Sequence, residues 1–138
     1  MSFVLDASIA GAWLLPDETS VIAEAALARL EVENAVVPDL FPHEVLNLLL
    51  SAERRGRLGI DELRGGVRRL ESFRLQTVKT PDPDLVIALS RKHKLSGYDA
   101  TYLAIAKQLH VPLATLDRHL LIAARNEDVE ILGASASS

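Results

Sequence analysis

The chain of 138 residues contains no cysteine, and this absence excludes several kinds of chemistry. Disulfides, iron–sulfur clusters and zinc sites with thiolate ligands all require cysteine. No apolar run approaches the length that crosses a bilayer, and the first residues lack the basic and then apolar pattern of a secretory signal. We therefore expect a cytoplasmic protein that makes no contact with a membrane.

Several common enzyme motifs are also absent. The sequence has no glycine-rich phosphate loop, no nucleophile elbow and no Cys–His pair. Its histidines show no spacing typical of metal ligands, so we interpret each as a surface residue or a hydrogen-bonded one. These are His43, His93, His110 and His119.

Charge is distributed unevenly along the chain. Residues 1–50 carry a net charge of −7, residues 51–80 carry +4, and the whole chain carries −4. This balance argues against a general nucleic-acid-binding protein, although the basic middle segment could contact phosphates. Arg54, Arg55 and Arg57 fit either a solvated helix end or a contact with an RNA backbone.

Short apolar runs alternate with helix-like segments, which predicts an α/β fold with a five-stranded parallel sheet covered by helices on both faces. We expect one domain over residues 1–133 and a flexible, low-complexity tail at residues 134–138. Ser8 and Ser20 are candidate helix N-caps, and Trp13 is a candidate core residue. The predicted strands are 3–5, 35–37, 76–78, 113–115 and 129–131; the predicted helices are 8–15, 20–33, 42–55, 61–74, 82–92, one from about 98 and a short one from 117.

Four acidic residues stand at the ends of these predicted elements. Asp6 and Asp117 each close an apolar strand, whereas Glu44 and Asp99 lie where helices begin. Ligands of parallel sheets bind beyond the carboxyl ends of the strands. We therefore expect the four carboxylates to share one pocket.

Each acid also has a simpler explanation when it is taken alone. An acid in a first helical turn complements the helix dipole for about 0.3–1 kcal/mol, and Asp6 could begin a turn. Four carboxylates about 6 Å apart, however, repel one another by more than about 10 kcal/mol at an effective dielectric near 20. That cost rivals the total stability of a domain, about 5–15 kcal/mol. Either protonation or a divalent cation must relieve it, and oxygen-only ligands favour Mg²⁺ or Mn²⁺.

Three polar residues could support this pocket. Ser8 and Thr115 each stand two residues from one of the acids, where they could hydrogen-bond a carboxylate or merely cap a helix. Asn47 follows Glu44 by about one helical turn on a polar stripe beside the core stripe.

With its four acids in this order, the chain resembles the PIN-domain nucleases, and more narrowly the VapC-type toxins of bacterial and archaeal toxin–antitoxin pairs. The resemblance implies a Mg²⁺- or Mn²⁺-dependent endoribonuclease that hydrolyses RNA phosphodiester bonds, forms a homodimer and binds a cognate antitoxin. It also implies that Asp6 and Asp99 are direct metal ligands and that Glu44 and Asp117 complete the catalytic pocket. The matching segments are residues 3–8, 37–40, 44–47, 98–106 and 113–117.

Two other functions are compatible with parts of this pattern. A non-catalytic interaction module of the same fold would bind a partner protein. A phosphatase that forms an aspartyl-phosphate would use Asp6 as nucleophile, but such enzymes place an acid two residues later, where this chain has Ser8.

Overall fold

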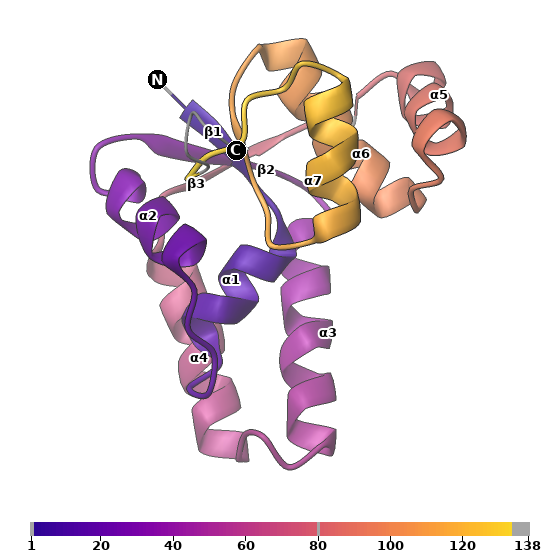
Figure 1. Cartoon of the computed structure of the whole chain (residues 1–138). Helices are drawn as coiled ribbons and strands as arrows, with labels where there is room; N and C mark the ends of the chain where they lie inside the picture. Colours follow the sequence, from indigo (N-terminus) through magenta and orange to yellow (C-terminus); the bar gives the residue numbers. More distant parts are fainter. Residues whose placement is uncertain (1, 80, 134–138) are drawn as a thin grey trace.

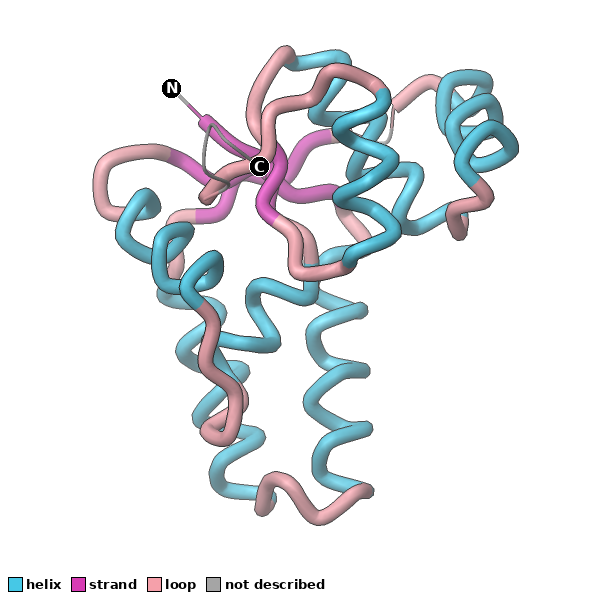
Figure 2. Tube along the Cα trace, viewed as in Figure 1, coloured by secondary structure: helices cyan, strands magenta, loops and turns pink. Residues whose placement is uncertain are grey.

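In a computed structural model that describes residues 2–79 and 81–133, four short parallel strands are flanked by helices (Figures 1 and 2). The predicted tail at residues 134–138 lies outside the described residues. The elements are β1 (Ser2–Leu5), α1 (Ala7–Leu14), α2 (Val21–Leu30), β2 (Asn34–Pro38), α3 (Phe41–Arg54), α4 (Ile60–Ser72), β3 (Leu75–Val78), α5 (Pro83–His93), α6 (Gly97–Leu109), β4 (Leu113–Ala114) and α7 (Arg118–Asn126).

The direction in which the chain adds strands to the sheet reverses at β1. The sheet runs β3-β2-β1-β4, and Val4 of β1 pairs with Val36 of β2 on one side and Leu113 of β4 on the other. The chain therefore adds β2 and β3 on one side of β1 and later adds β4 on the opposite side. Such a reversal opens a crevice at the carboxyl ends of the two strands it separates. Asp6 directly follows β1 there, and Asp117 follows β4.

The predicted fifth strand is wrong. Ile131 makes only an isolated parallel bridge to Leu113, supported by two backbone hydrogen bonds at the start of β4. Asp128 and Gly133 both have positive φ angles, 59° and 84°, which turn the backbone on either side of this segment. The extended stretch between these turns is too short to form a strand ladder.

The start of α1 and the end of α2 also differ from prediction. Asp6, not Ser8, is the N-cap of α1, because its side chain is the one that accepts a hydrogen bond from a backbone N–H of the first turn. Ser20 is the N-cap of α2, as predicted. That helix ends at Leu30 rather than near Glu33, and residues 31–33 continue as a turn and a bend.

Helix α6 and the sheet form a central part of the hydrophobic core, which also includes buried residues of α1, α2, α3 and α7. Every residue from Ala100 to Ala106 is buried, and α6 contacts β1, β2 and β4. Trp13 is buried as predicted, and its Nε1 donates to the carbonyl of Ala23 at 2.7 Å. Its ring also packs against that of Phe73 in a T-shaped arrangement, with 5.0 Å between the ring centroids.

Helices α3 and α4 project from the sheet as an antiparallel pair, with α1 packed against both (Figure 1). Arg57, in the loop that joins them, donates to Asp17 at 3.0 and 2.9 Å and to Glu18 at 3.0 Å. This arginine therefore anchors the turn after α1, whereas Arg54 and Arg55 are exposed. None of the helices in the described part of the chain is long and apolar enough to cross a membrane.

The helical pair carries two glycines that should respond oppositely to alanine. Gly65 is exposed within α4, and a Cβ there meets no atom within 4 Å. We expect Gly65→Ala to stabilise the protein by about 0.5–1 kcal/mol, because alanine lowers the entropy lost on helix formation. Gly56, in the loop between the two helices, has φ +77°. Gly56→Ala should therefore destabilise the protein by about 1 kcal/mol. Urea denaturation of both variants measures the change in the free energy of unfolding. Changes of the same sign in the two variants would contradict the prediction.

Candidate functional site

Asp6 is a buried carboxylate surrounded by hydrogen-bond donors. Only 4% of the residue is exposed. Its Oδ1 accepts from the backbone N–H of Ser8 at 3.0 Å and from the hydroxyl of Ser8 at 2.5 Å, and its Oδ2 accepts from the hydroxyl of Thr115 at 2.6 Å. Burial raises the pKa of Asp6 to about 6, although these hydrogen bonds act in the opposite direction.

The two hydroxyls also connect Asp6 to the segment that follows β4. The hydroxyl oxygen of Ser8 accepts from the N–H of Leu116 at 2.9 Å, and that of Thr115 accepts from the N–H of Asp117 at 3.0 Å. Ser8 and Thr115 therefore contact a carboxylate, and neither of them caps a helix. Asp117 is itself the N-cap of α7 and accepts from the N–H of Leu120 at 3.0 Å. In this way the two strand-end acids are joined through Thr115.

Glu44 lies in the first turn of α3 and meets a tyrosine from α6. The hydroxyl of Tyr102 donates to Oε1 of Glu44 at 2.6 Å. Burial and the nearby charge of Asp99 raise the pKa of Glu44, and the bond from Tyr102 opposes that rise. Sequence reasoning missed Tyr102, which it treated as part of an apolar helix. A signal was present, because Tyr102 follows Asp99 by three residues and so lies on a neighbouring part of the same helical face.

Asp99 lies in the first turn of α6 and is half-buried. Its backbone N–H donates to the hydroxyl of Ser96, the N-cap of this helix, at 3.1 Å. Burial raises the pKa of Asp99, and the charge of Asp117 raises it further, while Ser96 and His119 lower it. The acids from α3, α6 and the end of β4 therefore influence one another electrostatically.

Asn47 does not join this network of contacts. It is exposed on α3, and within residues 2–79 and 81–133 no hydrogen bond connects it to the four acids. The polar stripe that it shares with Glu44 therefore faces solvent at this position.

The side chains suit a hard cation by their chemistry but do not form a finished coordination shell. All four donors are carboxylates, and the salt bridges of the described residues pair none of them with a lysine or arginine. Oxygen donors of this kind bind Mg²⁺ or Mn²⁺. However, no three His, Asp or Glu side chains in the described part of the chain are placed to hold a metal ion. Asp6 and Glu44 instead accept hydrogen bonds from hydroxyl groups of the protein.

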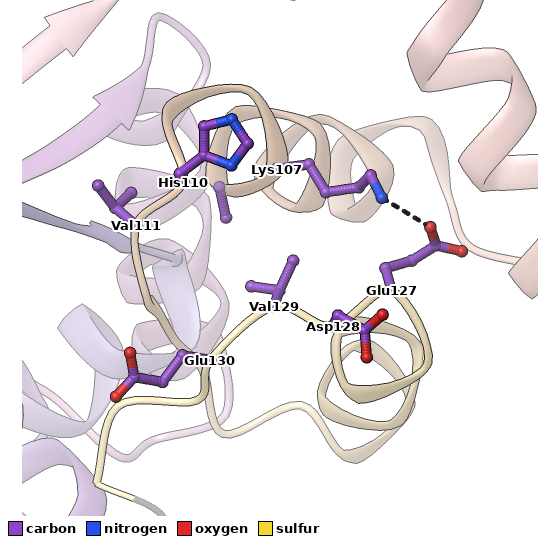
Figure 3. Close-up of a pocket in the computed structure, with 8 residues that line it drawn as sticks. Lys107, His110, Val111, Glu127, Asp128, Val129 and Glu130 are labelled. Carbon is purple, nitrogen blue, oxygen red and sulfur yellow. Dashed lines mark hydrogen bonds and ion pairs between the residues drawn. The ribbon is translucent and has the colours of Figure 1, made fainter.

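A cavity of about 400 Å³ lies apart from the four acids, beside the end of α6 (Figure 3). Lys107, His110 and Glu130 are among the residues that line it, and Glu127 forms an ion pair with Lys107 at 3.0 Å. Burial raises the pKa of Glu127, but hydrogen bonds from Lys92, His93 and Lys107 outweigh it and lower the value to about 2. This carboxylate is thus neutralised by the protein itself, in contrast to the four acids at the strand ends.

Comparisons with known proteins identify relatives of the whole domain. The family model described as "PIN domain" matches residues 3–126. Ribonuclease VapC3 of Pyrobaculum aerophilum is 37% identical over 123 residues, which cover 87% of this chain and 92% of the relative. The crystal structure of PAE2754 from Pyrobaculum aerophilum has a TM-score of 0.71 at 22% identity. The match covers 91% of this chain and 81% of the PAE2754 chain. The crystal structure of VapC20 of Mycobacterium tuberculosis, named as a Sarcin-Ricin loop cleaving toxin, has a TM-score of 0.61 at 15% identity. The match covers 88% of this chain and 94% of the VapC20 chain. The two structures share the fold.

The raised pKa of Asp6 predicts a specific dependence of stability on pH. In the folded protein this pKa is about 6, whereas the ordinary value is 3.8. The unfolded chain therefore binds fewer protons than the folded one between these values, and the stability falls as the pH rises through them. We expect metal-free Asp6→Asn to gain stability relative to the wild type on going from pH 4 to pH 7, by on the order of 2–3 kcal/mol.

Chemical denaturation in the presence of a chelator at several pH values measures this difference. The exposed Asp61→Asn variant is the control for the loss of one aspartate charge at the surface. A pH-independent effect of Asp6→Asn would contradict the prediction.

Proposed function

Because the chain belongs to the PIN-domain family, and within it to the VapC-type proteins, we propose that it is a Mg²⁺- or Mn²⁺-dependent endoribonuclease. The proposed reaction is hydrolysis of RNA phosphodiester bonds, and the proposed site consists of Asp6, Glu44, Asp99 and Asp117. The observation that carries the proposal is the set of carboxylates at the crevice beside β1. Three of them have raised pKa values, and burial is the main cause in each case. Perturbed carboxylates in one crevice are typical of catalytic and metal-binding sites.

Each acid has a part in the proposed mechanism. Asp6 and Asp99 would hold the cation, which when bound lowers the pKa of a water molecule and offsets the charge of the scissile phosphate. Ser8 and Thr115 fix the plane of the Asp6 carboxylate by donating to opposite oxygens. Either Glu44 or Asp117 would orient the attacking water or accept its proton.

The charge of the chain gives the cation a second role. The first fifty residues carry a net charge of −7, so they repel the phosphates of RNA. A bound cation would reduce this repulsion at the site. Arg54 and Arg55, exposed at the end of α3, are available to contact phosphates farther along the strand.

Removal of the metal or of Asp99 should abolish cleavage. We expect single-stranded RNA to be cleaved with Mg²⁺ or Mn²⁺ and to stay intact with EDTA. Asp99→Asn should lower kcat/KM by at least about a hundredfold, because it removes a proposed metal ligand. Asp61→Asn, an aspartate in the first turn of another helix, should retain wild-type activity. Gel electrophoresis of a labelled RNA measures all four reactions, and full activity in EDTA would contradict the proposal.

We also propose that the protein is the toxin of a VapBC-type pair, acting on RNA in the cytoplasm as a homodimer and restrained by an antitoxin. Coexpression with the neighbouring open reading frame should yield a complex that does not cleave RNA. Separation from the partner should restore the activity, and sedimentation equilibrium should give a dimer. If the separated protein still lacks nuclease activity while the complex is stable, the alternative of a pure interaction module is favoured.

A further inference from the structure

Tyr102 combines a buried ring with a polar contact in the candidate site. Only 1% of the residue is exposed, and the residues on either side of it in α6 are buried as well. Its hydroxyl donates to Oε1 of Glu44 at 2.6 Å, although the two residues are 58 positions apart in the sequence. A phenylalanine would supply the same buried ring. The hydroxyl therefore matters here through its bond to Glu44.

The surroundings of this hydroxyl make it a hydrogen-bond donor. Burial raises the pKa of Tyr102, and so do the hydrogen bond to Glu44 and the charges of Glu44, Asp6 and Asp99. The phenol thus keeps its proton at neutral pH. A protonated phenol that faces a carboxylate donates to it and fixes the carboxylate oxygen that it contacts.

The hydrogen bond from Tyr102 constrains the orientation of the Glu44 carboxylate. Glu44 is attached to α3 through three rotatable bonds, and Tyr102 anchors Oε1 from α6, the helix that also carries Asp99. The second oxygen, Oε2, takes part in no hydrogen bond or ion pair recorded within residues 2–79 and 81–133. It is therefore the oxygen available to a water molecule or a cation in the crevice.

We propose that Tyr102 is a positioning residue, which holds Glu44 so that its free oxygen faces the reacting water during RNA hydrolysis. This inference rests on the proposed function, since it assigns a task to Glu44 in that reaction. Catalytic groups that are displaced by as little as 1 Å can lose about a hundredfold in rate. A hydroxyl that sets the orientation of Glu44 should therefore influence kcat more than KM.

The test compares Tyr102→Phe with a matched variant, Tyr98→Phe. Tyr98 lies one turn earlier on the same helix, but 62% of it is exposed. We expect Tyr102→Phe to lower kcat by roughly 10–100-fold with little change in KM, and Tyr98→Phe to leave both unchanged. The double variant Tyr102→Phe/Glu44→Gln should lose no more activity than Glu44→Gln alone, because Glu44→Gln already removes the carboxylate through which Tyr102 acts. If Tyr102 had only a structural role, the fold losses in activity of the two single variants would multiply in the double variant.

A second measurement does not depend on activity. In protein labelled with ¹³C at the glutamate carboxyl carbons, the Glu44 signal is identified by its loss in Glu44→Gln. This signal should move in Tyr102→Phe and stay in place in Tyr98→Phe. An unmoved signal in Tyr102→Phe, or wild-type kcat in that variant, would overturn the role of Tyr102. If the wild type cleaves no RNA with either metal, the proposed function fails, and with it the role in catalysis, while the carboxyl signal still decides whether Tyr102 holds Glu44.

Discussion

The crevice beside β1 depends on the hydrogen bonds that hold the Asp6 carboxylate. This one side chain ends β1, caps α1 and accepts from Thr115 at the end of β4. Asp6 therefore joins the end of β1 and the start of α1 to the segment that follows β4. Its partners are hydroxyl and backbone N–H groups, which fix its position but supply no positive charge to balance it. The same contacts that organise the fold leave a buried negative charge at the site.

The contrast with Glu127 shows that this fold can neutralise a carboxylate where only structure is needed. Glu127 forms ion pairs with Lys92, His93 and Lys107, which lower its pKa to about 2. At Asp6, Glu44 and Asp99 the pKa values rise instead. Folding must bury these charges at a cost in free energy, and a ligand that binds only the folded site offsets that cost. Buried carboxylates without a positively charged partner are typical of sites adapted for binding rather than for stability.

Much of this arrangement follows from local sequence patterns. The apolar runs that end in Asp6 and Asp117 placed both acids at the carboxyl ends of parallel strands, because a parallel sheet with short connections leaves few other topologies. The absence of a fifth strand could not be predicted from such local patterns. Its pairing depends on the positive φ angles at Asp128 and Gly133, and neither can be read from the β-rich residues between them. The spacing of Tyr102 from Asp99 indicates the helical face on which it lies, but its contact with Glu44 could not be predicted, since it joins distant parts of the chain.

The packing of α6 also limits how this sequence can vary. Ala100, Ala104 and Ala106 are buried with almost no exposed surface, and α6 lies against three of the strands. A larger side chain at any of these alanines would push the helix away from the elements packed against it. Asp99 and Tyr102 would then move together relative to Asp6, which is fixed to β1. Substitutions at these alanines are therefore restricted, although the alanines touch no substrate. Their small size maintains the spacing of the acids.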